Sequence, residues 1–191
     1  GYPRTVRIWR RGTEPDQAEI VFEGEQGDVA SFGARFWDGD THYDMIIRAP
    51  GFFSRYYYLY RDGETHRLNV PDDAELAGLL DGQVLIDLKS DWEVAGTTFP
   101  QGALVAGPIE SFERESPELT VVFQPGERAS IASVSTTENT VLVHVLDNVV
   151  SNMLRFTHED GAWKRESLGV PDLGSLTVVS TDDRSDRFYY D

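Results

Sequence analysis

Residues 140–147, TVLVHVLD, are the stretch of sequence that decides the fold. Alternate side chains of a β-strand point to opposite faces. One face of this strand therefore carries Val141, Val143 and Val145, and the other carries Leu142 and Leu146. Both faces are therefore apolar. Strands of a two-sheet sandwich usually keep one polar face toward solvent, whereas a strand with two apolar faces lies between two other sheets. The stretch favours sheets that are stacked in series.

Most of the remaining sequence also predicts strands. Short runs rich in Val, Ile, Tyr and Phe occur at residues 6–11, 19–23, 43–49, 55–61, 65–70, 84–89, 104–107, 118–123, 131–136, 152–158, 163–168 and 176–181. Asp62-Gly63 and Asp160-Gly161 separate neighbouring runs and supply the positive φ angles that tight two-residue hairpins need. Consecutive strands are therefore expected to be antiparallel.

One segment, residues 71–82, has a helical pattern instead. Its leucines at positions 76, 79 and 80 have the spacing of one helix face, and Asp72 or Asp73 precedes them as a possible N-cap. We expect one or two helical turns there.

Strand runs that end in a Gly or Pro break recur along the chain. They start near Glu19, Thr65, Glu118 and Trp163, which are roughly 46, 53 and 45 residues apart, within the range of propeller repeats. About four strands fit one period. We expect an all-β fold, a partial β-propeller of four-stranded antiparallel blades with about four blades' worth of chain. The expected units are a half blade at 1–24, blades at about 28–70, 83–123 and 130–168, and a half blade at 175–191.

Composition excludes several classes of function. The 191 residues contain 17 Lys and Arg against 33 Asp and Glu, a formal charge of -16 that opposes binding to nucleic acid or to anionic membranes. The chain has no cysteine, which excludes disulfides and thiolate chemistry. No apolar run is long enough for a membrane span, and the first residues lack the basic-then-apolar order of a signal peptide. We expect a soluble, cytoplasmic chain.

Neither a metal site nor a catalytic pair is indicated. The four histidines, His42, His66, His144 and His158, lack the spacing that presents two imidazoles to one metal. We interpret His144 as a hydrogen-bonded core residue. The acidic run at Asp38, Asp40 and Asp44 fails as a calcium loop, because Tyr43 replaces the required Gly and Ala49 the bidentate Glu. No catalytic residue, metal or cofactor is expected.

An aromatic cluster is the most unusual local feature, and its members are Phe52, Phe53, Tyr56, Tyr57, Tyr58 and Tyr60. Exposed tyrosines bind peptides, proline rings in particular, by flat stacking. Alternation places Tyr56, Tyr58 and Tyr60 on one strand face, and these three are our candidate peptide-contact residues. The other interpretation is packing within a blade, because a strand buried on both faces needs bulky side chains.

Several short motifs resemble the propeller domain of prolyl oligopeptidase-family serine peptidases: residues 11–13 (RGT), 18–19 (AE), 21–24 (VFEG), 61–63 (RDG), 92–102, 141–149 (VLVHVLDNV) with Asn152, and 188–190 (FYY). The resemblance covers essentially the whole chain. It implies part of a seven-bladed propeller that covers the active site of an α/β-hydrolase domain and admits short peptides, which the longer protein cuts after proline. The chain contains no Gly-x-Ser-x-Gly nucleophile motif, so no catalytic residue is transferred to it.

The sequence also leaves two other functions open and suggests several partners. A free-standing propeller scaffold that binds a protein or peptide partner is the alternative function, and a propeller glycosidase is a third hypothesis that no particular carboxylate pair supports. The chain starts without Met and is within a strand pattern by Thr5, so we expect missing upstream sequence. The expected partners are the hydrolase domain, short peptides and, through the terminal half blades, a second copy in a homodimer.

Overall fold

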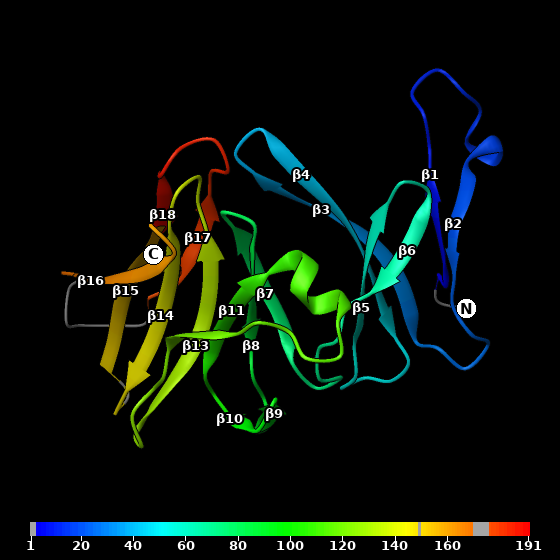
Figure 1. Ribbon diagram of the computed structural model, residues 1–191. Helices are drawn as coiled ribbons and strands as arrows, with labels where there is room; N and C mark the ends of the chain where they lie inside the picture. Colours follow the sequence, from blue (N-terminus) through cyan, green and yellow to red (C-terminus); the bar gives the residue numbers. More distant parts are fainter. Residues whose placement is uncertain (1–2, 149, 170–175) are drawn as a thin grey trace.

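Antiparallel β-sheets make up nearly all of the regular secondary structure in the computed structural model, which describes residues 3–148, 150–169 and 176–191 (Figure 1). Each of the three large sheets has four strands in chain order, starting with the β3–β6 sheet. It contains β3 (Ala30–Asp38), β4 (Thr41–Ala49), β5 (Tyr56–Arg61) and β6 (Glu64–Arg67). The β7–β12 sheet contains β7 (Glu75–Leu80), β8 (Gln83–Asp87), β11 (Leu104–Pro108) and β12 (Thr120–Phe123). The β13–β16 sheet contains β13 (Ala129–Thr136), β14 (Val141–Asp147), β15 (Val150–Glu159) and β16 (Ala162–Leu168).

Smaller elements flank or interrupt these sheets. Two-stranded sheets are formed by β1 (Thr5–Ile8) with β2 (Glu19–Glu23), by β9 (Trp92–Val94) with β10 (Thr97–Phe99), and by β17 (Val178–Thr181) with β18 (Phe188–Tyr190). The short 3-10 helices are η1 (Pro15–Gln17) and η2 (Ile109–Glu113). The β9–β10 hairpin lies within the segment 92–102, one of the short motifs noted in the sequence. No helix in the described part of the chain is long and apolar enough to cross a membrane.

The all-β fold with four-stranded antiparallel sheets is confirmed. The tight turns also form as expected, since Asp62 and Gly63 have φ angles of 54° and 85°, and Asp160 and Gly161 have 52° and 74°. Gly1 and Tyr2, Val149 at the end of the 141–149 motif, and Ser175 at the start of the expected last half blade lie outside the described residues. The homodimer through the terminal sheets stays a prediction.

The helix expected at 71–82 is wrong, because Glu75–Leu80 forms strand β7. A β-bulge lies between Leu76 and Gly78, and the extra residue shifts the alternation by one. As a result Leu76 and Leu79, three residues apart, both pack against the core beside the β3–β6 sheet, while Leu80 packs on the opposite side. The bulge thus reproduces helical spacing within a strand. The β7–β12 sheet consequently begins at Glu75, and the blade start expected near residue 83 is wrong.

Hydrophobic cores fill the spaces between neighbouring sheets. The first core joins the β3–β6 and β7–β12 sheets, the second joins the β7–β12 and β13–β16 sheets, and a small third core joins β14 and β15 to β17 and β18. Strand β14 serves two cores, because Val141, Val143 and Val145 face the second while Leu142 faces the third. The two apolar faces of this strand are therefore buried between sheets, except that Leu146 near its end is 36% exposed.

Tyr57 provides a polar link within the first core. Its buried hydroxyl donates to the carbonyl oxygen of Ala74 at 3.0 Å and accepts the N–H of Leu76 at 3.1 Å. We expect Tyr57→Phe to lower the free energy of unfolding by about 1–2 kcal/mol, because a backbone N–H then lacks its partner. Urea unfolding measures the change. The control Tyr60→Phe should stay within about 0.5 kcal/mol of wild type, and equal losses in the two variants would contradict the prediction.

Candidate functional site

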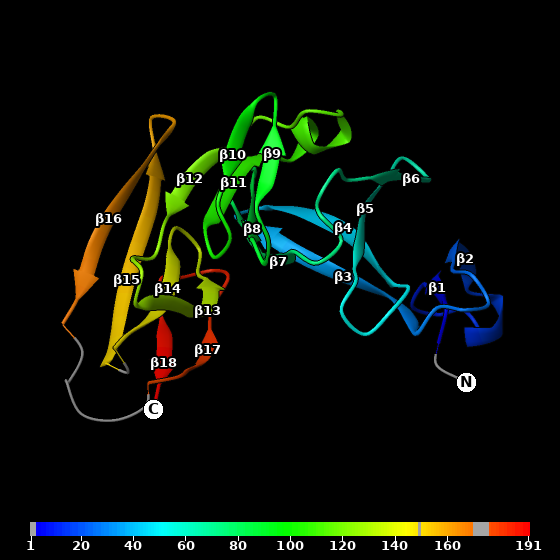
Figure 2. The ribbon, with the colours of Figure 1, turned by 90° about the horizontal axis from the view of Figure 1, so that it is seen from below.

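The first strands of successive sheets form the inner side of an arc. Strands β3 and β7, β7 and β13, and β13 and β17 are neighbours in space. Viewed from below, they follow the concave side of the molecule, while β6, β12 and β16 lie toward the outside (Figure 2). This is how blades are arranged around the central channel of a propeller.

The arc has two faces that differ in their connections (Figure 1). The turn face, at the top of the view, carries the turns between the first and second strands of the three large sheets and of the β17–β18 sheet, at residues 39–40, 81–82, 137–140 and 182–187. The loop face, at the bottom, carries the links between sheets at residues 24–29, 68–74 and 124–128, together with the loop 50–55 and the β9–β10 hairpin.

On the turn face, carboxylates connect three sheets. The Asp38 carboxylate accepts the backbone N–H groups of Asp81 at 2.8 Å and Gly82 at 2.6 Å, which ties the β3–β4 turn to the β7–β8 turn. Asp81 in turn contacts Nδ1 of His158 on β15 at 2.6 Å. A cleft of about 730 Å³ lies among these turns. The acidic run at 38–44 therefore begins with a residue that has a structural role.

The other acidic and histidine residues lie in separate places. Asp44 forms a bidentate pair with Arg35 at 2.6 and 2.7 Å, which lowers the pKa of that carboxyl group. His66 lies 3.3 Å from Glu113 on η2. Within residues 3–148, 150–169 and 176–191, no three His, Asp or Glu side chains are placed to hold a metal ion.

His144 and Ser151 form a buried pair, with His144 Nε2 3.1 Å from Ser151 Oγ on the neighbouring strand. Burial lowers the pKa of the imidazole, which favours the neutral ring. The two residues are only 7% and 8% exposed. The interpretation of His144 as a hydrogen-bonded core residue is confirmed.

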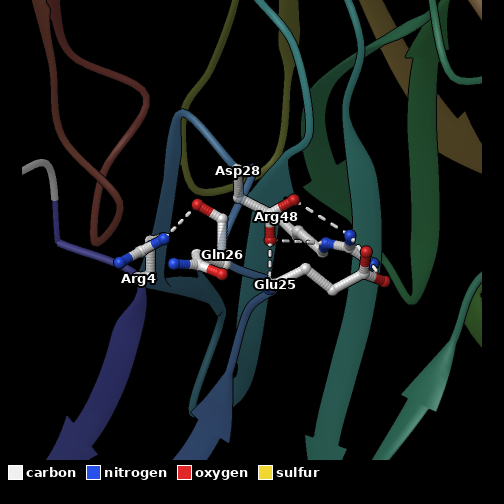
Figure 3. A network of polar contacts seen from close by, with 5 residues as sticks. All are labelled: Arg4, Glu25, Gln26, Asp28 and Arg48. Atoms are coloured by element: carbon white, nitrogen blue, oxygen red, sulfur yellow. Dashed lines mark hydrogen bonds and ion pairs between the residues drawn. The ribbon is translucent and has the colours of Figure 1, made fainter.

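A network of polar contacts lies where the β1–β2 sheet joins the β3–β6 sheet (Figure 3). Arg48 on β4 donates to both carboxylate oxygens of Asp28 at 2.8 and 2.9 Å and also pairs with Glu25 at 3.0 Å. Asp28 additionally accepts the N–H of Glu25 at 2.6 Å, and Arg4 donates to the carbonyl oxygen of Gln26. The network fixes the link between two sheets.

The three candidate tyrosines pack against protein groups. The Tyr58 ring lies 5.0 Å from that of Phe22 on β2. The Tyr56 ring is contacted by the guanidinium groups of Arg67 at 4.3 Å and Arg48 at 5.6 Å. Tyr60 lines a groove between the β1–β2 and β3–β6 sheets. A role of Tyr56, Tyr58 and Tyr60 in peptide contact therefore stays a prediction.

Two phenylalanines of the same aromatic cluster are placed differently. Phe52 and Phe53 occupy the β4–β5 loop on the loop face and are 74% and 91% exposed. Together with Phe32 at the start of β3, they line a cleft of about 440 Å³. The sequence did not predict them as peptide-contact residues, because the alternation of side chains along a strand gives no information about a loop. Their signal was an adjacent aromatic pair directly after the turn residues Pro50-Gly51.

The whole chain, residues 1–191, matches the model of a known family, described as prolyl oligopeptidase, N-terminal beta-propeller domain. The chain belongs to this family, and it is a propeller domain of prolyl oligopeptidase-like peptidases. The resemblance found in its short motifs is thereby confirmed.

Relatives and solved structures agree with this assignment. An uncharacterized peptidase of Sinorhizobium fredii is 32% identical over 99% of this chain and 27% of its own length. An uncharacterized peptidase of Rickettsia prowazekii is 29% identical over 86% of this chain and 24% of its own length. The structure of a post-proline cleaving enzyme from Rickettsia typhi superposes with a TM-score of 0.81 at 25% identity, covering 93% of this chain and 27% of that one. The chain thus spans about a quarter of the proteins that it matches.

A more distant structure shows the fold alone. It is prolyl oligopeptidase B from Galerina marginata, with a TM-score of 0.66 at 13% identity, covering 95% of this chain and 26% of that one.

Proposed function

We propose that this chain is the non-catalytic propeller part of a longer serine peptidase that hydrolyses short peptides after proline. In this proposal the propeller covers the active site of an α/β-hydrolase domain, admits short peptides and keeps out large folded proteins. The observation that carries the proposal is the family match over residues 1–191. The similarity to a post-proline cleaving enzyme supports the substrate class.

The residues of the chain are consistent with catalysis by another domain of the longer protein. Acyl transfer needs a nucleophile activated by a base, next to donors that stabilise the oxyanion. The sequence has no Gly-x-Ser-x-Gly elbow, and the hydrogen-bonded pair of His144 with Ser151 is buried. We therefore assign the nucleophile, base and acid to the hydrolase domain of the longer protein.

Size selection follows from the architecture in the same proposal. The inner strands β3, β7, β13 and β17 line the concave side of the arc, and a ring built on that curvature encloses a channel that side chains narrow. A flexible peptide passes through an opening of this kind, whereas a folded domain does not. Both relatives are described as peptidases, which favours this function over a free-standing scaffold.

The test compares the 191-residue chain with the longer gene product on a chromogenic substrate that has proline before the reporter group. We expect no release above background with the chain alone and turnover with the longer protein, blocked by a serine-reactive inhibitor. A longer protein that folds but hydrolyses neither this substrate nor longer proline-containing peptides would contradict the proposal. So would inhibitor-sensitive activity of the purified chain.

A further inference from the structure

Polar contacts on the turn face join the successive sheets of the arc. Asp38 and Asp81 connect the first three sheets, as described above. Asp186, in the β17–β18 turn, continues the series, because its carboxylate accepts the hydroxyl of Thr137 and the backbone N–H of Asn139, both at 2.8 Å. The β17–β18 turn is thereby attached to the β13–β14 turn, and all four turns of this face are linked.

The β17–β18 turn also has bonds of its own that fix its conformation. The Asp182 carboxylate accepts the backbone N–H of Arg184 at 2.9 Å and the hydroxyl of Ser185 at 2.8 Å. The backbone N–H of Asp182 donates to the carbonyl oxygen of Arg187 at 3.1 Å, which closes the turn. These bonds determine where the side chain of Arg184 leaves the backbone.

Arg184 makes a contact that skips two sheets. Its guanidinium carbon lies 6.0 Å from the centroid of the Trp37 ring on β3. The β7–β12 and β13–β16 sheets lie between the two residues along the arc. Figure 1 and Figure 2 both show the β17–β18 turn beside the β3–β4 turn. Because the inner strands surround the concave side, a contact between the first and the last of them crosses the mouth of the channel.

Trp37 is positioned from its own sheet. The Arg35 guanidinium lies 5.9 Å from its ring centroid and is itself held by the bidentate pair with Asp44, and the His42 ring lies 5.2 Å away. A guanidinium over an indole ring is attracted by the negative face of the ring, and at an exposed site this attraction is weak. A peptide that enters the mouth therefore displaces Arg184 at little cost, whereas Trp37 stays in place.

We propose that Trp37 and Arg184 form a constriction at the turn-face mouth of the channel and determine which peptides pass. A single extended peptide passes by displacing the Arg184 side chain, and a peptide that is folded back on itself is excluded. This inference rests on the proposed function, because it takes the channel to be a route for substrates. It adds to that function two specificity-determining residues and a preference for extended over closed peptides.

The first test measures the contact itself. The chain has no cysteine, so Trp37→Cys with Arg184→Cys introduces its only two thiols. We expect a short bismaleimide to join them within one chain, as identified by mass spectrometry after proteolysis. The control pair Trp9→Cys with Arg184→Cys places the first thiol in the link between β1 and β2 and should not be joined within one chain. Failure of the first pair to cross-link would overturn the inference.

The second test measures selection by the longer protein. Two substrates share one proline-containing sequence, and one of them is closed into a hairpin by a disulfide. Trp37→Ala with Arg184→Ala should raise kcat/KM for the closed peptide about fivefold or more and leave that for the linear peptide within about twofold of wild type. The control Arg165→Ala removes an exposed arginine on the outer strand β16 and should change neither value.

Cross-linking the two cysteines in the longer protein should have the opposite effect and lower kcat/KM for the linear peptide. The same reagent applied to the longer protein without these cysteines is the control. An active enzyme whose preference for the linear peptide is the same in the alanine variant and after cross-linking would contradict the inference alone. A longer protein that cross-links between positions 37 and 184 but hydrolyses no proline-containing peptide would contradict the proposed function alone.

Discussion

Replacing Gly107 by alanine is expected to lower the free energy of unfolding by about 3–5 kcal/mol. A Cβ atom at this position would lie 2.1 Å from the carbonyl oxygen of Glu118 and 3.2 Å from the ring of Phe112. Gly107 belongs to β11 and pairs with Val84 in the middle of the β7–β12 sheet. The Glu118 backbone is held by its N–H, which donates to Ser111 Oγ at 3.2 Å. The strand must therefore shift, and its pairing is lost.

Urea unfolding followed by tryptophan fluorescence measures this loss. Gly126→Ala is the matched control, because a Cβ atom there meets nothing within 4 Å and the residue lies outside the positive-φ region. The control should stay within about 0.5 kcal/mol of wild type. Similar urea midpoints for both alanine variants would show that the contact at Gly107 relaxes without cost.

Asp28→Asn is expected to lower the free energy of unfolding at pH 7 by about 2 kcal/mol, because a charge-assisted bidentate pair becomes a neutral contact. The Asp28 side chain is only 3% exposed and Arg48 is 15% exposed, so water replaces little of the lost interaction. Glu25 still pairs with Arg48 in the variant, which limits the loss. Glu23→Gln, on the neighbouring strand β2, serves as a control that also removes one negative charge.

The effect of Asp28→Asn should depend on pH. Hydrogen bonds from Arg48 hold the pKa of Asp28 below its ordinary value, although burial acts in the opposite direction. A lowered pKa in the folded state stabilises the protein above the unfolded pKa of about 3.9 and loses that contribution as pH falls through the folded value. The difference between wild type and variant should therefore be largest at neutral pH and shrink below about pH 4. A difference that stays constant between pH 7 and pH 3 would contradict this assignment.

The sequence was sufficient for the fold class because its strongest local signals agree with the overall architecture. Strand β14 is apolar on both faces since it lies between two cores, and the Asp-Gly pairs adopt the positive φ angles of tight hairpins. Each of these signals depends on residues close together in the chain. The alternation of apolar side chains and the turn residues therefore predict strands and hairpins correctly without knowledge of the neighbouring sheets.

The predictions fail for residues whose structure depends on contacts with distant parts of the chain. The bulge at Leu76 and Gly78 gives β7 the leucine spacing of a helix, and only pairing with β8 reveals the strand. Alternation grouped Tyr56, Tyr58 and Tyr60 correctly on one face, but that face is covered in part by the β1–β2 sheet, from residues far away in the sequence. Phe52 and Phe53 lie in a loop whose carbonyl oxygens accept hydrogen bonds from Arg55, and strand periodicity does not encode such a loop.

Because the cores lie between successive sheets, the free energy of unfolding of this chain depends mainly on contacts between sheets that are neighbours in the array. The β7–β12 and β13–β16 sheets each share one core with the sheet before them and another with the sheet after them, whereas the β3–β6 sheet shares a core only with the β7–β12 sheet. Stability in such arrays is approximately a sum of intrinsic terms and nearest-neighbour couplings. The β7–β12 sheet, coupled strongly on both sides, is then the cooperative centre of the chain, and a defect at Gly107 propagates in both directions, whereas local opening at β17–β18 affects one neighbour.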